Sequence, residues 1–421
     1  MPSSRLRICF LTYRGNPRCG GQGIYTKHLT RELAALGHTV EVWSGQPYPE
    51  LDPGVTLRPI PSLDLWNEEQ FFRTPSLREL RDPINRSEWL QTVTGLFVEP
   101  HTFSRRVLRA YRQLPSHERF DIVHDNQCLG DGLPALRSLV PLVATIHHPV
   151  TMDRKFAMRN ARGIRARLGV WRWYSFIPAQ KRVAQVLDRV LTVSVASADD
   201  IAREFGLSRD RIDVVTNGVE LDKFQPLPHI ERRPDRLLST LSADAPLKGF
   251  PFLLEALSVV RRERPGVTLT VVGSDGRRST RERIERLGLE GAVNFTGQVT
   301  TEELVRLYAE STVAVVPSLY EGFGLPAAEA MACGVPLVST SAGALPEVVG
   351  ESGVAGVLVP PGQADSLARQ ITGLLGAPER CEAMGVAGRE RVASLFTWRR
   401  AAERAVEVYR KAIALRRSGE C

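Results

Sequence analysis

The chain has 421 residues, of which 43% are hydrophobic and 24% charged. This length suits two domains with full cores, and the composition excludes a disordered chain. Six widely spaced cysteines form no CxxC pair and no Cys/His zinc spacing, so we expect reduced thiols and a cytoplasmic protein. No stretch approaches the ~20 apolar residues of a membrane-spanning helix, and the first apolar run is too short for a signal peptide.

The formal net charge of +8 is concentrated in one segment, because residues 151–185 contain nine arginines and lysines and one acidic residue. Ile164, Leu168 and Trp171 follow helical spacing there, as in helices that lie on anionic membranes. We therefore predict peripheral association with the inner membrane face. The alternative is a solvated basic helix whose aromatic side chains pack into the first domain. No recognition motif accompanies the charge, so no nucleic acid partner is expected.

Short β-rich runs alternate with helical patterns along the chain, which predicts βαβ units and parallel sheets. The runs fall into two series, so we expect an α/β protein with two doubly wound, Rossmann-like domains that face each other across a cleft. The expected strands are Ile8–Thr12, Val40–Trp43, Ile122–His124, Leu142–Ile146, Val190–Val193 and Ile212–Val215, then Leu237–Leu241, Val267–Val272, Val293–Thr296, Val313–Val316, Pro336–Ser339 and Gly356–Val359.

Domain boundaries follow from breaks in this rhythm. A proline-bearing stretch after residue 216 lacks periodicity and is interpreted as the linker. We expect a first domain at 1–216, a second at 217–396, and an amphipathic helix at 397–421. Residues 61–114 also break the rhythm, and they are expected to form an irregular insertion.

A glycine-rich turn follows the first strand and contains Gly20, Gly21 and Gly23. Such a turn lets the backbone approach a ligand, and the N-terminus of the next helix favours an anion. The spacing is not GxGxxG, because position 26 is threonine, so a nicotinamide cofactor is disfavoured. A strand-to-helix turn that binds nothing is the alternative.

A buried strand ends in His147, at the edge of the sheet where α/β proteins bind ligands. An imidazole there can donate to a hydroxyl or carbonyl oxygen. A loop histidine without a role is the alternative.

The most informative block runs from Glu321 to Glu329. A strand leads into a glycine-bearing loop, and Pro326 marks the first turn of a helix. Free amides and the helix dipole can hold phosphates, while the two carboxylates accept hydrogen bonds from sugar or ribose hydroxyls. A glycosidase acid/base pair is the alternative. Lys248 precedes another helix and offers a point charge to phosphate, although it can equally be a solvated surface lysine. The loop residues are Gly322, Phe323, Gly324 and Leu325.

These motifs together resemble the retaining nucleotide-sugar glycosyltransferases of family 4, which have the GT-B fold. The resemblance covers most of the chain except residues 61–114. It rests on Gly20-Gly21-x-Gly23, Thr145-x-His147, Asn217-Gly218-Val219, Lys248-Gly249, Glu321-x7-Glu329 and Gly343-Ala344-Leu345-Pro346-Glu347.

The resemblance implies a role for each matched residue. The second domain would bind the donor, the first would bind the acceptor, and the final helix would cross back onto the first. Glu321 would contact the transferred sugar, Glu329 the ribose and Lys248 the diphosphate, and His147 would lie beside the sugar. Backbone at Gly322, Phe323, Gly324 and Leu325 would hold phosphate or sugar, and Gly20, Gly21 and Gly23 would face the diphosphate.

One position departs from the family pattern. An arginine usually stands six residues before the lysine, but here that position is Ser242. Either Arg277 or Arg278 supplies the missing charge, or the donor is handled differently.

We therefore predict a hexosyltransferase that moves a sugar, with retention, from a nucleotide diphosphate sugar to a hydroxyl of a lipid-linked or glycan acceptor. No D-x-D occurs in the chain, so neither a metal nor another cofactor is expected. Two alternatives stay open: another GT-B enzyme, such as a nucleotide-sugar epimerase or a phosphorylase, and a catalytically silent nucleotide-sugar-binding protein.

Overall fold

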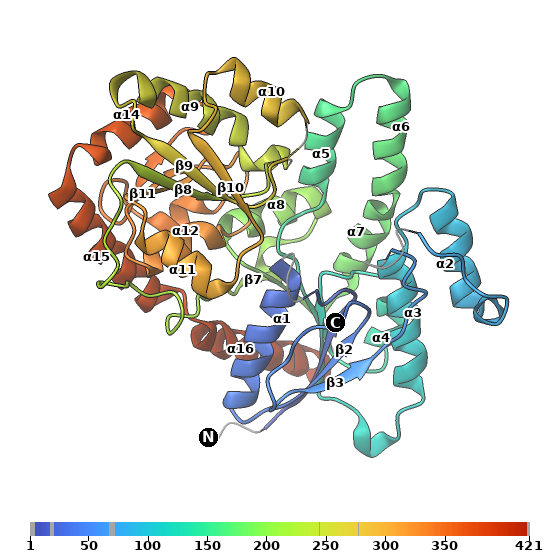
Figure 1. Ribbon diagram of the computed structural model, residues 1–421. Coiled ribbons are helices and arrows are strands. Elements are labelled where there is room, and N and C mark those ends of the chain that lie inside the picture. Colours follow the sequence, from blue (N-terminus) through green and yellow to red (C-terminus); the bar gives the residue numbers. More distant parts are fainter. Residues whose placement is uncertain (1–4, 17–20, 67–71, 244, 277, 419–421) are drawn as a thin grey trace. The chain divides into compact units, whose positions relative to one another are not determined.

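The computed structural model describes residues 5–16, 21–66, 72–243, 245–276 and 278–418. These residues form two compact units (Figure 1). The first unit comprises the described residues up to Val193, then Ser197–Val215, and those from Trp398 onward. The second unit comprises Ser194–Ala196 and Thr216–Thr397.

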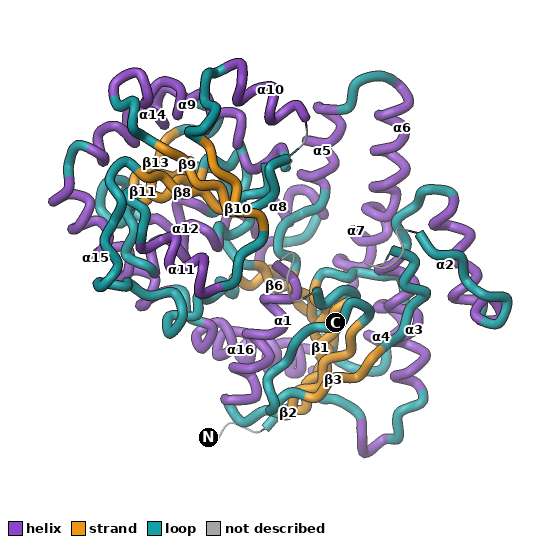
Figure 2. Tube along the Cα trace, viewed as in Figure 1, coloured by secondary structure: helices purple, strands orange, loops and turns teal. Residues whose placement is uncertain are grey.

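The described part of the first unit contains a seven-stranded parallel sheet, in the order β3-β2-β1-β4-β5-β6-β7. Its strands carry near-continuous apolar runs because both faces are covered by helices, as in other parallel sheets. Figure 2 shows these strands running together between helices. The strands are β1 (Arg7–Thr12), β2 (Thr39–Ser44), β3 (Thr56–Pro59), β4 (Ile122–Asn126), β5 (Leu142–Thr145), β6 (Arg189–Thr192) and β7 (Ile212–Val214).

Alternating residues of β1 supply the two cores of this unit. Ile8 and Phe10 pack with α1 (Gly21–Ala35) and α16 (Trp398–Ser418). Cys9 and Leu11 face the opposite side, as the period of two in a strand requires. Helices on that side are α3 (Glu99–Arg112), α4 (Leu133–Arg137), α7 (Ile177–Val186) and α8 (Val195–Phe205). The C-terminal helix therefore returns to the first unit, as predicted.

The region 61–114 is not an irregular insertion throughout, so that expectation is wrong. Its second half forms α2 (Pro83–Val93) and α3. Asp82 caps α2, because its side chain accepts from the Ile84 amide. Helix α3 then packs Phe103, Val107 and Tyr111 into the core, because residues four apart share one face.

The basic segment forms α5 (Thr151–Asn160), α6 (Ile164–Trp173) and all of α7 except its last residue. Helix α6 has no buried residue, and Trp171 is 64% exposed. Other aromatic side chains of the segment do pack, since Trp173 stacks on Phe97 with ring centroids 5.1 Å apart and Phe176 is buried. No helix within the described ranges is long and apolar enough to cross a membrane.

In the described part of the second unit, a six-stranded parallel sheet has the order β10-β9-β8-β11-β12-β13. Helices α9 (Phe250–Glu263) and α14 (Ala364–Leu375) pack on one face. The strands are β8 (Arg236–Thr240), β9 (Thr268–Val272), β10 (Val293–Gly297), β11 (Val313–Val316), β12 (Leu337–Thr340) and β13 (Val357–Val359). The other helices are α10 (Arg278–Arg286), α11 (Thr301–Ala309), α12 (Leu325–Ala332), α13 (Leu345–Val349) and α15 (Pro378–Leu395).

Candidate active site

The glycine-bearing loop of the second unit connects β11 to α12. Gly324 occupies the N-cap position of α12 with φ +101°, a left-handed conformation that favours glycine. A Cβ at Gly324 would lie 2.7 Å from a methyl carbon of Leu345, so the loop also needs glycine there for space. The first turn of α12 therefore presents its amides at the end of the loop, where the helix dipole favours an anion.

Glu321 is fixed in this loop by two donors. Ser318 Oγ donates to Glu321 Oε1 over 2.8 Å, and Lys248 Nζ lies 2.7 Å from the same oxygen. The carboxylate is 8% exposed, so this ion pair is less screened than a surface pair. The second oxygen, Oε2, is left for other donors.

Lys248 reaches Glu321 because two loops are locked together at the ends of β8 and β11, which are neighbours in the sheet. The Leu319 amide donates to the Leu247 carbonyl oxygen over 2.7 Å. Gly249 has φ +66°, and a Cβ there would lie 1.9 Å from the Pro317 carbonyl oxygen. Glycine after Lys248 is therefore required for the two loops to approach.

Glu329 lies in α12, one turn beyond the loop. Burial raises the pKa of its carboxyl to about 8, and the nearby charge of Glu220 adds to the rise. Below that pH the group is protonated in the chain without ligand. A ligand that donates hydroxyl hydrogens would favour the ionised form.

Ser242 follows β8, and its carbonyl oxygen accepts from the Ala245 amide over 3.1 Å. Arg278, one of the two arginines considered as a substitute cation, has a 92% exposed side chain that pairs with Glu282 at 2.8 Å. This surface pair does not support Arg278 as that cation. The other, Arg277, lies outside the described residues.

The glycine-rich segment of the first unit is only partly described, and Gly20 lies outside the described residues. A Cβ at Gly23 would lie 2.1 Å from the Asn16 carbonyl oxygen, whereas one at Gly21 would meet nothing within 4 Å. Close packing therefore requires glycine at position 23, where α1 begins beside the loop, but not at position 21.

His147 follows β5 and is held by Asn126 at the end of β4. The Asn126 amide nitrogen donates to the Gln22 carbonyl oxygen over 3.1 Å, which fixes the orientation of that amide because a carbonyl only accepts. Asn126 Oδ1 lies 2.8 Å from His147 Nε2, so Nε2 carries the proton. Burial and the nearby His148 lower the pKa of His147 to about 3. The ring is neutral, and its Nδ1 is an acceptor rather than a second donor.

A second chain of hydrogen bonds supports the same histidine. Tyr25 places its ring edge-on to His147, with centroids 4.7 Å apart. Its hydroxyl lies 2.9 Å from Thr145 Oγ1, which also lies 2.7 Å from His124 Nε2. The other nitrogen of His124 lies 2.6 Å from the hydroxyl of Tyr409 in α16. Elements from both ends of the chain therefore set the orientation of His147.

The structure thus brings Lys248, Glu321 and the start of α12 together in the second unit, and His147 beside α1 in the first. The sequence reasoning missed Ser318, Asn126 and Tyr25. Asn126 and Tyr25 are ordinary polar residues at the end of a strand and the start of a helix, and only their contacts with His147, far away in the sequence, mark them. Ser318 bonds Glu321 only three residues along the same loop. Among the described residues, no three His, Cys, Asp or Glu side chains are grouped so that they could hold a metal ion.

Solved structures with the same fold identify the class. Sucrose-phosphate synthase from Thermosynechococcus elongatus matches 97% of this chain and 100% of its own, with a TM-score of 0.73 and 25% identity. HepE of Anabaena, solved with UDP and glucose, matches 96% of this chain and 99% of its own with a TM-score of 0.69 and 19% identity, a likeness of fold alone. Two parallel α/β units with this topology define the GT-B glycosyltransferases.

Sequence matches identify the family. The family model described as Glycosyltransferase Family 4 matches residues 19–223, and the one described as Glycosyl transferases group 1 matches residues 228–391. An MMP α-(1→4)-mannosyltransferase from Mycolicibacterium hassiacum is 47% identical over 97% of this chain and 99% of its own. A D-inositol 3-phosphate glycosyltransferase from Segniliparus rotundus is 29% identical over 95% of this chain and 86% of its own. The chain belongs to the family 4 GT-B glycosyltransferases and is a nucleotide-sugar glycosyltransferase.

Proposed function

We propose that the protein transfers an α-mannosyl group, with retention, from a nucleotide diphosphate mannose to the 4-hydroxyl of a sugar acceptor, without a metal ion. The 47% identity with a mannosyltransferase over nearly the whole of both chains supports the sugar and the linkage. Membership of the family supports retention. The observation that carries the chemistry is the Lys248–Glu321 pair at 2.7 Å beside the start of α12.

The second unit supplies the proposed donor site. The diphosphate is bound by Lys248, by the backbone amides of Phe323, Gly324 and Leu325, and by the dipole of α12. The chain therefore supplies the positive charge that a metal ion would otherwise bring. Glu329 accepts from the ribose hydroxyls. Glu321 Oε2 accepts from the transferred sugar, while Ser318 and Lys248 hold the other oxygen.

During transfer, the bond between the anomeric carbon and the donor phosphate oxygen breaks as the acceptor oxygen bonds to that carbon. The departing phosphate oxygen takes the acceptor proton on the same face of the sugar, which keeps the anomeric configuration. The protein provides positioning and electrostatic stabilisation of the leaving diphosphate. In the first unit, His147 Nδ1 accepts a hydrogen bond from a hydroxyl of the sugar. The backbone of the Gly20–Gly23 segment contacts the diphosphate.

A panel of GDP-, UDP- and ADP-sugars with a methyl α-mannoside acceptor tests the function. Transfer of mannose from a mannose-bearing donor, in the presence of EDTA, with an α linkage in the product by proton NMR, is the expected result. A β-linked product, or loss of activity in EDTA that Mg²⁺ restores, would contradict the retaining or the metal-independent part. Turnover of the donor alone into an isomeric sugar nucleotide would instead identify an epimerase.

We also propose that the segment 151–185 binds an anionic membrane surface. Arginines on α6 surround exposed Ile164, Leu168 and Trp171, which are 79%, 54% and 64% exposed. Each basic residue near an anionic surface contributes ~1 kcal/mol. The test is cosedimentation with liposomes of graded anionic lipid content, with Arg162, Arg165, Arg167 and Arg172 all changed to glutamine in the comparison variant. Equal recovery of both proteins in the supernatant at low salt would exclude membrane binding.

A further inference from the structure

The loop that follows β4 contains two residues with an unusual backbone conformation. Gln127 has φ +53° and Leu129 has φ +48°, so both lie in the left-handed region, which is uncommon for residues other than glycine, asparagine and aspartate. Such conformations persist only where the surrounding structure holds them, and they cluster near functional sites. The loop is therefore strained, and other contacts must offset that strain.

Gln127 uses both ends of its side-chain amide to hold the backbone that carries His147. Its Oε1 accepts from the His147 amide over 2.7 Å, and its Nε2 donates to the His148 carbonyl oxygen over 3.1 Å. These bonds fix which end of the side chain is oxygen, because a backbone amide only donates and a carbonyl only accepts. Gln127 is 7% exposed, so water competes little for either bond. The backbone before and after the two histidines is therefore fixed.

Asn126 and Gln127, which are adjacent in the chain, hold different parts of the same histidine. Asn126 Oδ1 accepts from the ring at Nε2, whereas Gln127 holds the backbone. Neighbouring side chains of an extended strand point to opposite faces of the sheet, so a strand continued through Gln127 would turn its side chain away from that of Asn126. The left-handed conformation of Gln127 interrupts this alternation. Both side chains can consequently reach His147.

Asp125 holds the loop in this conformation. One of its carboxylate oxygens accepts from the Leu129 amide over 2.9 Å, and the side chain is completely buried. Burial raises the pKa of Asp125 to about 7, while the amides of Leu129 and Cys128 act in the opposite direction. The protonated and the ionised carboxyl each have an oxygen that accepts from an amide. The loop therefore requires a hydrogen-bond acceptor at this position and not a charge.

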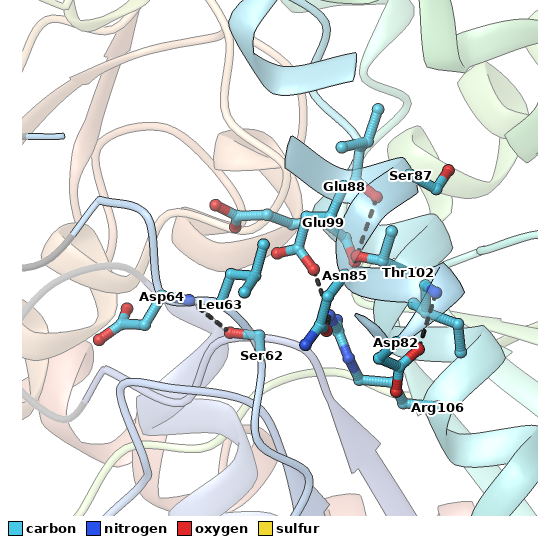
Figure 3. Close-up of polar contacts among 12 residues, drawn as sticks. Ser62, Leu63, Asp64, Asp82, Asn85, Ser87, Glu88, Glu99, Thr102 and Arg106 are labelled. Atoms are coloured by element: carbon cyan, nitrogen blue, oxygen red, sulfur yellow. Dashed lines mark hydrogen bonds and ion pairs between the residues drawn. The ribbon is translucent and has the colours of Figure 1, made fainter. Parts of the chain in front are cut away.

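The far end of the loop rests on α3. A Cβ at Gly130 would lie 2.2 Å from the Pro100 carbonyl oxygen, so the loop packs directly against the start of that helix. Helix α3 is tied in turn to α2, because Arg106 donates to Asn85 Oδ1 over 2.6 Å and pairs with Glu88 (Figure 3). The loop is consequently anchored at both ends, by Asp125 and by α3.

We propose that Gln127 is a positioning residue for the transfer reaction, which holds His147 so that Nδ1 faces the sugar, and that Asp125 keeps Gln127 in the conformation this requires. The proposal rests on the proposed function, in which Nδ1 accepts a hydrogen bond from a hydroxyl of the sugar. A displacement of about 1 Å can cost roughly 100-fold in rate. Both residues act through His147, and neither belongs to a motif that carries the family resemblance.

The first test uses the full-length protein with saturating donor and methyl α-mannoside. Gln127→Met keeps the length of the side chain and removes both hydrogen bonds. Gln185→Met is the matched control, because Gln185 Nε2 also donates to a backbone carbonyl oxygen 20 residues away, that of Phe205, over 3.2 Å. Circular dichroism and thermal unfolding establish that each variant is folded, and rates are measured well below each Tm.

We expect the kcat of Gln127→Met to fall roughly 10- to 100-fold. Its affinity for the free nucleotide diphosphate should stay within about twofold, because the proposed nucleotide site lies in the second unit and lacks any contact with His147. All constants of Gln185→Met should also stay within about twofold of the wild type. A kcat of Gln127→Met equal to that of Gln185→Met would overturn the proposal.

Gln127→Glu separates positioning from a simple loss of stability. When protonated, the new carboxyl group has an acceptor oxygen and an O–H donor, so it can make both bonds. When ionised, it places an oxygen against the His148 carbonyl, and this repulsion together with burial raises its pKa. The ratio of variant to wild-type kcat should therefore rise at least about fivefold from pH 8 to pH 5. The His148 imidazole pairs with Asp153 at 2.7 Å in both proteins and cancels in the ratio. A ratio independent of pH would contradict the proposal.

The part played by Asp125 is tested by two substitutions. Asp125→Asn keeps an acceptor for the Leu129 amide and should leave kcat within about threefold, whereas Asp125→Ala removes the acceptor and should lower kcat as Gln127→Met does. If Asp125 acts through Gln127, combining Asp125→Ala with Gln127→Met should cost no more than about threefold beyond Gln127→Met alone. Losses that multiply would show that Asp125 does not act through Gln127.

Nitrogen-15 NMR of the His147 side chain gives a readout that does not depend on transfer. We expect the Nε2 proton to exchange with water about tenfold faster in Gln127→Met than in the wild type or in Gln185→Met. If this difference appears but no donor yields a mannoside, the proposed function fails while the positioning by Gln127 stands. Mannosyl transfer with unchanged exchange in Gln127→Met would leave the function standing and exclude the positioning.

Discussion

The Lys248–Glu321 cluster of the second unit and the His147 cluster of the first are built from opposite kinds of hydrogen bond. In the former, the Lys248 ammonium group donates to a carboxylate oxygen of Glu321 over 2.7 Å. In the latter, an amide, hydroxyls and two imidazoles with pKa values near 3 are linked without any formal charge. The charged cluster can therefore rearrange its hydrogen bonds when a charged ligand binds. The neutral cluster offers a fixed pattern of donors and acceptors whatever the charge of the ligand.

In the second unit, the positive charge of Lys248 can therefore be shared between Glu321 and a bound ligand. A diphosphate that approaches Lys248 competes with Glu321 for the same ammonium hydrogens, and Ser318 remains bonded to the carboxylate in either case. In the first unit, the hydrogen bonds hold the His147 imidazole in one tautomer and one orientation. Breaking each cluster should consequently produce different kinds of defect.

The largest effect is expected for Glu321→Gln. The amide keeps the size of the side chain but removes the negative charge beside the reacting sugar, so kcat should fall at least about 100-fold. Binding of the free nucleotide diphosphate, measured by titration calorimetry, should stay within about threefold, because the nucleotide lacks the sugar that Glu321 would contact. A wild-type kcat would contradict the placement of Glu321 at the sugar.

Lys248→Ala should lower donor affinity about 10- to 100-fold, since a hydrogen bond to a charged group contributes about 1.5–3 kcal/mol. The same change leaves Glu321 buried beside Ser318 alone, and thermal unfolding should show a lower Tm. Adding Glu321→Gln to Lys248→Ala should recover part of that Tm, because the unpaired charge is gone. A double variant no more stable than Lys248→Ala would show that the pair is not coupled.

Asn126→Asp sharpens the comparison by placing a charge in the neutral cluster. A carboxylate beside Nε2 favours the imidazolium form and should raise the pKa of His147 by about 1–3 units or more. The wild-type rate should not depend on this group between pH 5 and 8, since its pKa is about 3. In the variant, the rate should fall as pH decreases. Gln127→Glu, which adds a carboxylate beside the His147 backbone, is the control, and identical pH profiles for Asn126→Asp and wild type would contradict the assignment.

Because of Glu329, we expect donor affinity to change by up to tenfold per pH unit. Its pKa of about 8 means that the free protein carries the proton below pH 8, whereas ribose hydroxyls donate to the ionised form. Donor binding should release a proton, and affinity should rise as pH increases toward 8 and level off above it. Calorimetry in buffers of different ionisation enthalpy measures the released proton. Glu329→Gln should abolish both effects.

The smallest effect is expected for the glycine segment. Gly23→Ala forces a Cβ to 2.1 Å from the Asn16 carbonyl oxygen, and a loss of about 1 kcal/mol would lower Tm by about 2–4 °C in a unit of this size. Gly21→Ala is the matched control, because a Cβ there meets nothing within 4 Å. Equal Tm values for the two variants would mean that α1 shifts freely at its first turn.

Most of the fold could be predicted because buried parallel strands leave continuous apolar runs. The strands expected in both series are confirmed. Strand β3 was missed because it lies at the edge, ends in Pro59 and contains no buried residue. Helix α3 carries a signal that was overlooked, since Phe103, Val107 and Tyr111 are spaced four apart and all buried.

The candidate site could be predicted only where a local motif carries it. Lys248 and Glu321 each stand beside glycines that the sequence shows, but their contact requires β8 and β11 to be neighbours. The tautomer of His147 depends on Asn126 and Gln22, which lie about 20 and 125 residues away in the sequence. Such arrangements arise from tertiary packing, which no spacing in the sequence records.

The return of α16 to the first unit bears on how the protein is made. Trp398 stacks on His28 with ring centroids 5.2 Å apart, and Tyr409 bonds His124 in the centre of the sheet. A ribosome that has completed residues 1–215 has therefore not yet made the helix that covers one face of that sheet. This apolar face of the first unit stays uncovered until the second unit has been synthesised and α16 follows it. Chaperone dependence during translation, and aggregation of chains that stop before Trp398, are the expected consequences.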